Sequence, residues 1–389
     1  MRPFGTTIFT EMSALAVRTD SINLGQGFPD TDGPVAMLEA AALALRSGRN
    51  QYPPLAGIPE LRAAIAAHQR RFYGLEYDPD AEILVTAGAT EAIAACVLGL
   101  CEPGDEVVLF EPFYDSYAAS LSLAHATPRP VTLRPMADGR YGFDPDELRA
   151  AFSGRTKVVL LNSPHNPTGK VFTPSELDAV AQLCQEYDAI AVTDEVYEHL
   201  VFSDAGPVDD PSTVHCPIAT LPGMRERTLR VSSGGKTFSC TGWKVGWVSG
   251  PAQLVAAATR VKQFLTFVNA GPLQPAIAVA LGLPDSYFSQ FASSLQHKRD
   301  ALVDGLSAAG LTVYASEGTY FVTVDITPLG GTDGVEFCLS LPQRCRVVAI
   351  PAQVFYADPA PGRHIVRFAF CKRDEVIADA ATRLRRLAA

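Results

Sequence analysis

The sequence lacks the features of a membrane or secreted protein. No apolar run approaches the roughly 18 residues of a membrane span. The start, from Met1 to Thr7, has no uninterrupted signal-peptide core, because Glu11 interrupts the apolar residues after it. Positive charge is also scarce, since 32 Lys and Arg residues stand against 42 Asp and Glu residues, for a net charge of −10. This balance argues against nucleic acid or an anionic membrane as a partner, although a local basic pocket remains open.

Metal-binding and disulfide patterns are missing as well. The eight cysteines are scattered, with no C-x-x-C pair and no Cys/His cluster at zinc-ligand spacing. Cys96 and Cys184 lie within apolar helical patterns, as small core residues do. We therefore expect no metal site and a cytoplasmic, reducing location.

The chain instead has the composition of a large, well-buried enzyme, with 389 residues of which 47% are hydrophobic and 19% charged. This length favours one large domain plus a smaller one. Across the middle, short apolar strands alternate with helices such as Thr90–Leu100 and one that Thr173 and Glu176 open with a capping box. The expected strands are Ile83–Thr86, Glu106–Phe110, Lys157–Leu161, Ala189–Thr193, Thr228–Ser232 and Lys244–Ser249. This rhythm predicts an α/β fold in which a mostly parallel sheet lies between two helical layers.

After Pro284 the pattern changes to that of a smaller α+β domain. The expected elements are a long helix from Asp285 to about Ala309, strands over Leu311–Ala315, Tyr320–Asp325, Val347–Ile350 and Ile365–Ala369, a helix over Gly334–Leu341 and a closing helix. We place the large domain at residues 46–284 and the small C-terminal domain at residues 285–389. Residues 1–45 are expected to form an N-terminal arm and part of the small domain.

Lys236 is the most informative residue of the chain. It stands among small residues, after Gly234 and Gly235, and Lys244 follows eight positions later. This pattern suits an amine that forms a Schiff base beside a phosphate, as pyridoxal 5′-phosphate (PLP) requires. The alternative is a solvated loop lysine.

Other unusual polar residues fall at the carboxyl ends of the expected strands, where ligands of open parallel sheets bind. Ala89 and Thr90 open a helix whose first N–H groups can bind phosphate, unless the turn is an ordinary one. Asn166 lies in a loop fixed by prolines and a glycine, which would hold its amide as a donor to a cofactor phenolate. A plain tight turn is the alternative there.

Asp194 ends a fully apolar strand, where a carboxylate is costly unless it is paired. A protonated pyridine nitrogen would be such a partner, and Tyr197 could donate to the same phenolate as Asn166. The alternative is an aspartate that caps the next element. Near another strand end, Tyr114 or Tyr117 could stack on a flat cofactor or belong to the core.

Arg367 lies in an otherwise apolar strand, so it needs an anion. A substrate carboxylate and an internal Asp or Glu are equally open as partners. Together these residues supply an aldehyde trap, a phosphate cradle, a partner for the ring nitrogen, phenolate donors, a stacking ring and a carboxylate clamp. The combination indicates a PLP-dependent amino-acid enzyme.

The motifs resemble those of the class I/II aminotransferases of PLP fold type I. The resemblance rests on Asn166-Pro167-Thr168-Gly169, Asp194-Glu195-Val196-Tyr197, the Lys236 segment and Arg367-Phe368, which occur in the family's order and spacing. It implies that Lys236 is the Schiff-base lysine and proton shuttle, that Asp194 pairs with the ring nitrogen, and that Asn166 and Tyr197 hold the ring oxygen. The other implied roles are stacking for Tyr114, phosphate binding for Ala89, Thr90, Ser233 and Lys244, and α-carboxylate binding for Gly27 and Arg367. Tyr52 would reach the phosphate of the neighbouring subunit, which implies a homodimer with shared active sites.

One departure is Lys244, where many members have arginine, since lysine supplies charge but no fork geometry. A narrower likeness, in Asn23 to Asp30 and in Ser163 to Asn166, points to the branch of kynurenine aminotransferases, methionine aminotransferases and cysteine-conjugate β-lyases. Asn50 to Pro54 and Phe370 to Asp374 are similar to actinobacterial N-succinyldiaminopimelate aminotransferases of lysine biosynthesis. The expected substrates are therefore an amino acid and a 2-oxo acid, with that enzyme's reaction favoured.

Three other classes compete with this interpretation. Racemisation, decarboxylation or β-elimination would use the same residues. A nucleotide-binding loop is suggested by Gly235-Lys236-Thr237, but it requires a glycine where Arg230 stands. A transcription regulator built on an aminotransferase-like domain would need a DNA-binding module, for which we see no room before Gly25.

Overall fold

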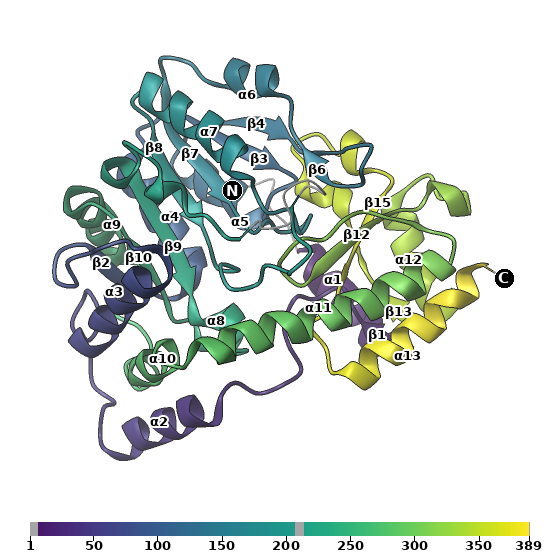
Figure 1. Cartoon of the computed structure of the whole chain (residues 1–389), viewed down its shortest axis with the longest axis horizontal. Coiled ribbons are helices and arrows are strands. Elements are labelled where there is room, and N and C mark those ends of the chain that lie inside the picture. The colour runs from purple at the N-terminus through teal and green to yellow at the C-terminus, as the bar shows by residue number, and fades with distance from the viewer. Residues whose placement is uncertain (1–6, 207–213, 389) are drawn as a thin grey trace.

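The computed structural model describes residues 7–206 and 214–388, and its centre is a seven-stranded sheet (Figure 1). The strand order is β2-β10-β9-β8-β7-β3-β4. The strands are β2 (Ile83–Thr86), β3 (Glu106–Glu111), β4 (Thr127–Thr132), β7 (Thr156–Asn162), β8 (Ile190–Asp194), β9 (Thr228–Ser233) and β10 (Gly246–Ser249). Only β10 runs antiparallel to its neighbours, so the predicted mostly parallel sheet is confirmed.

Helices cover both faces of this sheet because its strands are apolar on both sides. In β3, Val107 and Leu109 pack with one set of helices, while Val108 and Phe110 pack with another. The first set is α4 (Gly88–Leu100), α5 (Asp115–Leu123) and α9 (Ala252–Leu265), and the second is α6 (Pro145–Ala151) and α7 (Pro174–Glu186). At the β2 and β10 end, α2 (Val35–Arg46), α3 (Pro59–Tyr73) and α10 (Gln274–Leu281) cover the second face.

Local signals set most boundaries in this layer. The capping box of α7 is present, with the Thr173 side chain and the Glu176 carboxylate each bonded to the other's backbone. The helix predicted from Thr90 begins two residues earlier, at Gly88. The strand predicted from Lys244 begins only at Gly246, because Lys244 adopts a left-handed φ of 53° that no strand accommodates.

The C-terminal part forms a four-stranded sheet in the order β11-β12-β15-β14. Its strands are β11 (Thr312–Val313), β12 (Phe321–Asp325), β14 (Ile350–Pro351) and β15 (Ile365–Ala369), and its helices are α11 (Asp285–Ala308), α12 (Gly334–Cys345) and α13 (Asp374–Leu384). The single strand predicted over 347–350 is instead divided between β13 (Val347–Val348) and β14, which belong to different sheets. A further hairpin joins β5 (Arg134–Pro135) to β6 (Tyr141–Gly142).

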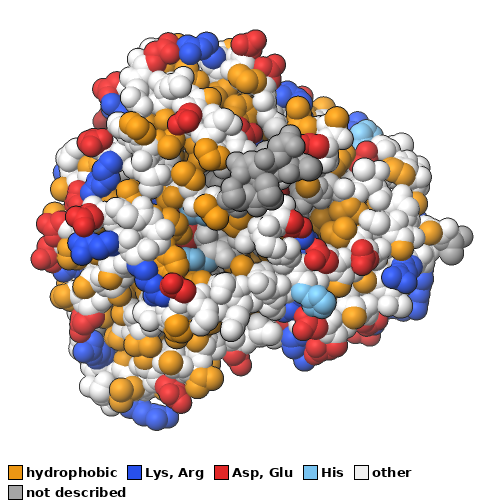
Figure 2. Space-filling model, viewed as in Figure 1, with side chains coloured by type: hydrophobic (Ala, Val, Ile, Leu, Met, Phe, Trp, Pro, Cys, Tyr) orange, Lys and Arg blue, Asp and Glu red, His pale blue; other side chains and the backbone are white. Residues whose placement is uncertain are grey.

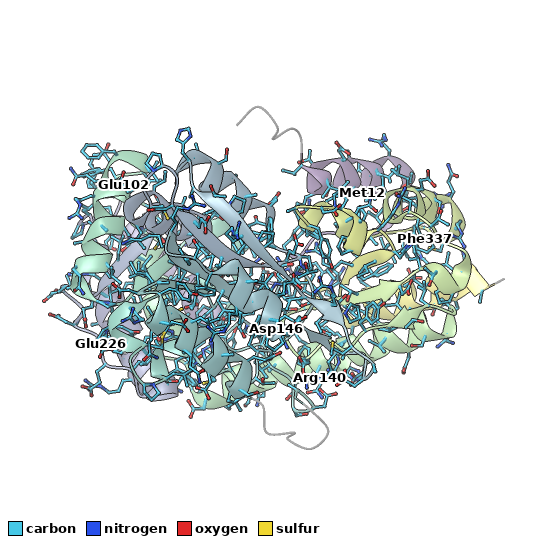
Figure 3. The ribbon with its side chains drawn as sticks, turned by 90° about the horizontal axis from the view of Figure 1, so that it is seen from above. Met12, Glu102, Arg140, Asp146, Glu226 and Phe337 are labelled. Carbon is cyan, nitrogen blue, oxygen red and sulfur yellow. The ribbon has the colours of Figure 1, made fainter. Side chains whose placement is uncertain are left out.

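The N-terminal residues contribute to both parts of the molecule. Helix α1 (Ile8–Thr19) packs beside α12, and β1 (Ile22–Asn23) pairs in parallel with β13. Figure 3 shows Met12 of α1 and Phe337 of α12 on the same side of the molecule, and both belong to one apolar cluster. Helix α2 lies far from α1, against α10 (Figure 1). The division at residues 45 and 284 remains our proposal.

Two surface findings bear on possible partners. None of the helices formed by the described residues is both long and apolar enough to cross a bilayer. On the face drawn in Figure 2, acidic and basic side chains are interspersed and form no continuous basic field.

Candidate active site

One cavity of about 430 Å³ gathers almost all of the predicted site residues. It lies where the carboxyl ends of β7 and β8 face the C-terminal sheet. The predicted residues that line it are Gly27, Ala89, Thr90, Tyr114, Asn166, Asp194, Tyr197, Ser233, Lys236, Lys244 and Arg367. Tyr52 does not line this cavity and is 82% exposed.

Lys236 enters the cavity from α8 (Gly234–Thr237), a single turn directly after β9. Its Nζ lies 5.7 Å from the centroid of the Tyr197 ring and 5.6 Å from that of the Tyr320 ring. Burial lowers the pKa of Lys236 to about 8, since desolvation disfavours the ammonium. A far larger fraction of this amine than of an ordinary lysine is therefore uncharged near neutral pH, as a nucleophile requires.

Asp194 ends β8 and is held in place by a neighbouring tyrosine. The Tyr117 hydroxyl donates to Asp194 Oδ2 at 2.6 Å, and the Val196 amide donates to Oδ1 at 3.3 Å. Burial raises the pKa of this carboxyl, and the bond from Tyr117 opposes that rise. A cationic ligand group beside Asp194 would stabilise its ionised form.

The loop after β7 is fixed by Asn162 at its base. Its Nδ2 donates to the carbonyls of Pro164 and Asp194, at 3.1 and 2.8 Å, and its Oδ1 accepts from the Asn166 amide at 2.7 Å. The Asn166 side chain is therefore presented to the cavity on a rigid backbone. The sequence reasoning assigned no role to Asn162.

The start of α4 forms a narrow cradle with Lys244. Gly88 has a φ of +76°, and a Cβ added there would come within 3.1 Å of Lys244 Nζ. A Cβ on Gly246 would come within 2.6 Å of the Gly88 carbonyl carbon, so only glycine allows these segments to meet. Ala89 and Thr90 follow at the positive end of the helix dipole, beside the ammonium, where an anion such as phosphate is stabilised.

Arg367 is buried to 1% exposure, yet no ion pair to it occurs among the described residues. Its Nη1 donates to Asn166 Oδ1 at 2.9 Å and its Nη2 to the Gly25 carbonyl at 2.7 Å, while its Nε has no partner there. Burial lowers its pKa to about 10. The internal Asp or Glu partner left open by the sequence is therefore not found among them, and a carboxylate in the cavity would be favourable.

A buried charged network behind Asp194 escaped the sequence reasoning. Arg230 pairs with both oxygens of Glu195 and reaches Glu198 at 3.4 Å, and His215 Nε2 donates to Glu195 Oε2 at 2.7 Å. Although burial opposes it, Arg230 and His215 hold the pKa of Glu195 well below its usual range. Arg230 lies in a strand that also contains Thr228, Ser232 and Ser233, so its sequence signal is weaker than that of Arg367.

One group of potential metal ligands occurs within the described residues, formed by His68, Glu198 and His199. The two imidazoles already bond to each other, with 2.7 Å between their Nε2 atoms. We assign no ion to this group.

Fold and cavity together define a PLP-dependent enzyme that acts on amino acids. The chain belongs to the family "Aminotransferase class I and II", whose model matches residues 19–384. It is 50% identical to "Probable N-succinyldiaminopimelate aminotransferase DapC" of Mycobacterium tuberculosis, over 100% of this chain and 98% of that protein. It is 42% identical to "Methionine aminotransferase" of Escherichia coli, over 98% of this chain and 96% of that protein.

Solved structures agree with these relatives. The N-succinyldiaminopimelate aminotransferase of M. tuberculosis superposes with a TM-score of 0.94 at 49% identity, covering 100% of this chain and 98% of that one. An aspartate aminotransferase of Thermus thermophilus superposes with a TM-score of 0.89 at 30% identity, covering 99% and 98%. The predicted family, fold and cofactor are thereby confirmed.

The residues of the cavity fit PLP. The Lys244 cradle suits its phosphate, Asp194 its ring nitrogen, and the partly deprotonated amine of Lys236 its aldehyde. When bound, PLP supplies a carbonyl carbon that exchanges amino groups and a ring that delocalises the electron pair left at the substrate α-carbon.

Proposed function

We propose that this aminotransferase moves the amino group of N-succinyl-LL-diaminopimelate to 2-oxoglutarate (EC 2.6.1.17), a step of lysine biosynthesis in the cytoplasm. The 50% identity to the M. tuberculosis protein over the whole chain is the observation that carries this substrate. The reaction class rests on the match of residues 19–384 to the aminotransferase family, and the cavity supplies the residues for it.

The roles proposed for the side chains follow from their positions. Lys236 holds and returns the proton of the substrate α-carbon, because its lowered pKa keeps a neutral amine available. Asp194 keeps the ring nitrogen protonated, and Asn166 and Tyr197 donate to the ring oxygen. Tyr114 stacks on the ring, and Ala89, Thr90, Ser233 and Lys244 bind the phosphate.

Gly27 and Arg367 are proposed to bind the substrate α-carboxylate. A Cβ on Gly27 would come within 2.4 Å of the Phe321 ring, so this backbone lies tightly against the cavity wall. Arg367 supplies the charge, since both of its hydrogen-bonded nitrogens contact only neutral acceptors. Both the amino acid and the 2-oxo acid carry this carboxylate, so one clamp serves both halves of the exchange.

A second candidate is a kynurenine or methionine aminotransferase, or a cysteine-conjugate β-lyase. It is favoured by the rings of Phe9, Phe28 and Phe321, which line the cavity, the first and last of them against Arg367. Such rings suit an aromatic or thioether side chain. Among the described residues that line the cavity, the cations are Lys236, Lys244 and Arg367, all of which have a role above.

A substrate panel separates these candidates. The PLP-loaded enzyme is assayed with 2-oxoglutarate as acceptor and with N-succinyl-LL-diaminopimelate, kynurenine, methionine or aspartate as donor. The first donor should give the highest kcat/KM. If the enzyme uses kynurenine efficiently and does not use N-succinyl-LL-diaminopimelate, the second candidate replaces the proposal. Release of pyruvate and ammonia from a cysteine conjugate would identify the lyase.

We also propose that the enzyme is a homodimer. Tyr52, exposed by 82%, packs edge-on against Phe267 at a centroid distance of 5.7 Å. Phe264 and Leu265 of α9 are exposed by 84% and 51% beside it. An apolar surface of this kind around Tyr52 suits a subunit contact through which Tyr52 reaches the neighbouring cavity.

A further inference from the structure

The segment from Leu24 to Asp30 is fastened to the C-terminal sheet along its length. The Leu24 carbonyl accepts from the Ala369 amide at 2.7 Å, and the Gly25 carbonyl accepts from Arg367 at 2.7 Å. Further along, the Phe28 carbonyl accepts from Lys372 Nζ at 2.7 Å and the Asp30 carboxylate from the Arg373 amide at 2.7 Å. This segment therefore forms one unit with the C-terminal sheet.

Tyr320 holds the middle of this segment. It directly precedes β12 and is 0% exposed, and its hydroxyl donates to the Gly27 carbonyl at 2.6 Å. A Cβ on Gly27 would lie 2.9 Å from the Tyr320 ring, so ring and backbone are in direct contact. No hydrogen bond within the described chain uses the Gly27 amide, which leaves that donor for a ligand.

Tyr320 differs from the other anchors because it also faces residues that follow strands β8 and β9 of the large sheet. Its ring stands edge-on to that of Tyr197, with centroids 5.3 Å apart and an interplanar angle of 90°. Lys236 Nζ lies to one side of this ring pair, nearly equally far from the two centroids, at 5.7 and 5.6 Å. Tyr320 thus lies behind the cavity wall, where it contacts the segment that carries Gly27 and stands near both Tyr197 and the Lys236 amine.

We infer that Tyr320 is a positioning residue which fixes Gly27 relative to Lys236, so that a carboxylate bound by Gly27 and Arg367 places its α-carbon at the Lys236 amine. The inference rests on the proposed amino transfer. It requires no contact between Tyr320 and the substrate. Loss of the hydroxyl leaves the ring and its packing in place but frees the Gly27 carbonyl.

The test compares Tyr320→Phe with Tyr141→Phe in the PLP-loaded protein. Tyr141 is also buried, and its hydroxyl bonds to Thr323 Oγ1 at 3.0 Å, outside the cavity lining. Tyr320→Phe should lower kcat/KM for the amino acid about tenfold, the size expected for one buried hydrogen bond. The loss should appear in kcat as well as in KM, because a displaced Gly27 both weakens carboxylate binding and moves the α-carbon away from the amine. Tyr141→Phe should change the melting temperature by a similar amount and leave KM unchanged.

Two further measurements do not depend on turnover. Calorimetry with hexanoate, an unreactive carboxylate, should show weaker binding to Tyr320→Phe than to the native protein and Tyr141→Phe. Amide hydrogen exchange should accelerate in residues 24–30 of Tyr320→Phe alone. Unchanged hexanoate binding and unchanged exchange there would overturn the inference. If native protein transfers no amino group from any donor, the proposed function fails, while these two measurements still decide the role of Tyr320.

Discussion

Arg367 Nη1 donates to Asn166 Oδ1 across 2.9 Å, and this bond joins β15 of the C-terminal sheet to the loop that follows β7. Because the amide oxygen of Asn166 is engaged, its NH₂ group remains free to donate to a ligand. The same bond fixes the guanidinium, whose charge no carboxylate of the described residues neutralises. In the proposed function, this pair of side chains links substrate binding to cofactor binding.

Arg367→Met should raise KM for both the amino acid and the 2-oxo acid. Loss of a charge-assisted pair costs about 1.5–3 kcal/mol, roughly ten- to a hundredfold in affinity. Thermal stability should not fall, since the variant removes a buried charge that lacks an internal counterion. Steady-state kinetics and calorimetric melting measure both effects. Arg363→Met, at an exposed arginine, is the matched control, and equal KM values in the two variants would contradict the assignment.

Lys236→Ala should abolish amino transfer and the visible absorbance of the protein-bound cofactor. Among the described residues, the only other lysine that lines the cavity is Lys244, which stands in the phosphate cradle. Spectra and activity are measured after gel filtration with PLP. Lys157→Ala, at an exposed position, should behave as the native protein does. Near-normal activity of Lys236→Ala would defeat the whole assignment.

The rate at which PLP loads onto the apoenzyme should rise with pH through about 8. Only the neutral amine attacks the aldehyde, and burial lowers the pKa of Lys236 to about 8 from 10.5. Asp194 raises that pKa, so Asp194→Asn should move the midpoint to lower pH. Stopped-flow absorbance between pH 6 and 10 measures both midpoints. A midpoint near 10 in the native protein would show an ordinary, solvated lysine.

Acid should destabilise the fold through the pair of His68 and His199. Burial lowers the pKa of His68 to about 4 and that of His199 to about 3, with Glu198 opposing and Arg230 adding to the shift. The unfolded chain, with a histidine pKa of about 6.5, therefore binds these protons first. The contribution of the two neutral histidines to the free energy of unfolding is therefore complete above about pH 6.5. It declines as the pH falls toward 4. Melting temperatures measured from pH 7 to 4.5 should fall less steeply in His68→Gln, whereas the exposed His297→Gln should follow the native slope.

Phe264→Glu should dissociate the proposed homodimer. A carboxylate placed in an apolar subunit contact is desolvated without a partner. Light scattering coupled to gel filtration should give half the native mass, and PLP affinity should fall as Tyr52 is lost from the neighbouring site. Leu339→Glu introduces the same charge at another exposed apolar residue, in α12, and should leave the mass unchanged. A monomeric native protein would exclude the proposal.

The sequence predicted the cavity residues well because a parallel sheet collects the ends of its strands at one edge. Asn166, Asp194 and Lys236 each follow such an end, so local patterns were sufficient to bring them together. The predicted and observed boundaries of an element differ where one residue adopts a conformation outside that element, as Lys244 does before β10.

Contacts between residues far apart in the sequence were not predicted. Tyr117 reaches Asp194 across 77 positions of sequence, and Tyr320 reaches Gly27 across 293. The sequence places Tyr117 only as a stacking ring or a core residue, and Tyr320 only at the start of a strand. A single arginine in a buried strand likewise has two outcomes, since Arg230 finds Glu195 and Arg367 finds no carboxylate within the described chain. Only the folded arrangement distinguishes them.

The anchoring of residues 24–30 to the C-terminal sheet separates two tasks within one enzyme. The proposed catalytic residues follow the central strands, whereas Phe28 and Phe321, two aromatic residues of the cavity wall, belong to the anchored segment and the C-terminal sheet. Substitutions in the anchored segment and the C-terminal sheet can therefore alter substrate choice without changing the proposed catalytic residues. These two regions are the natural target for mutant libraries that seek new amino donors.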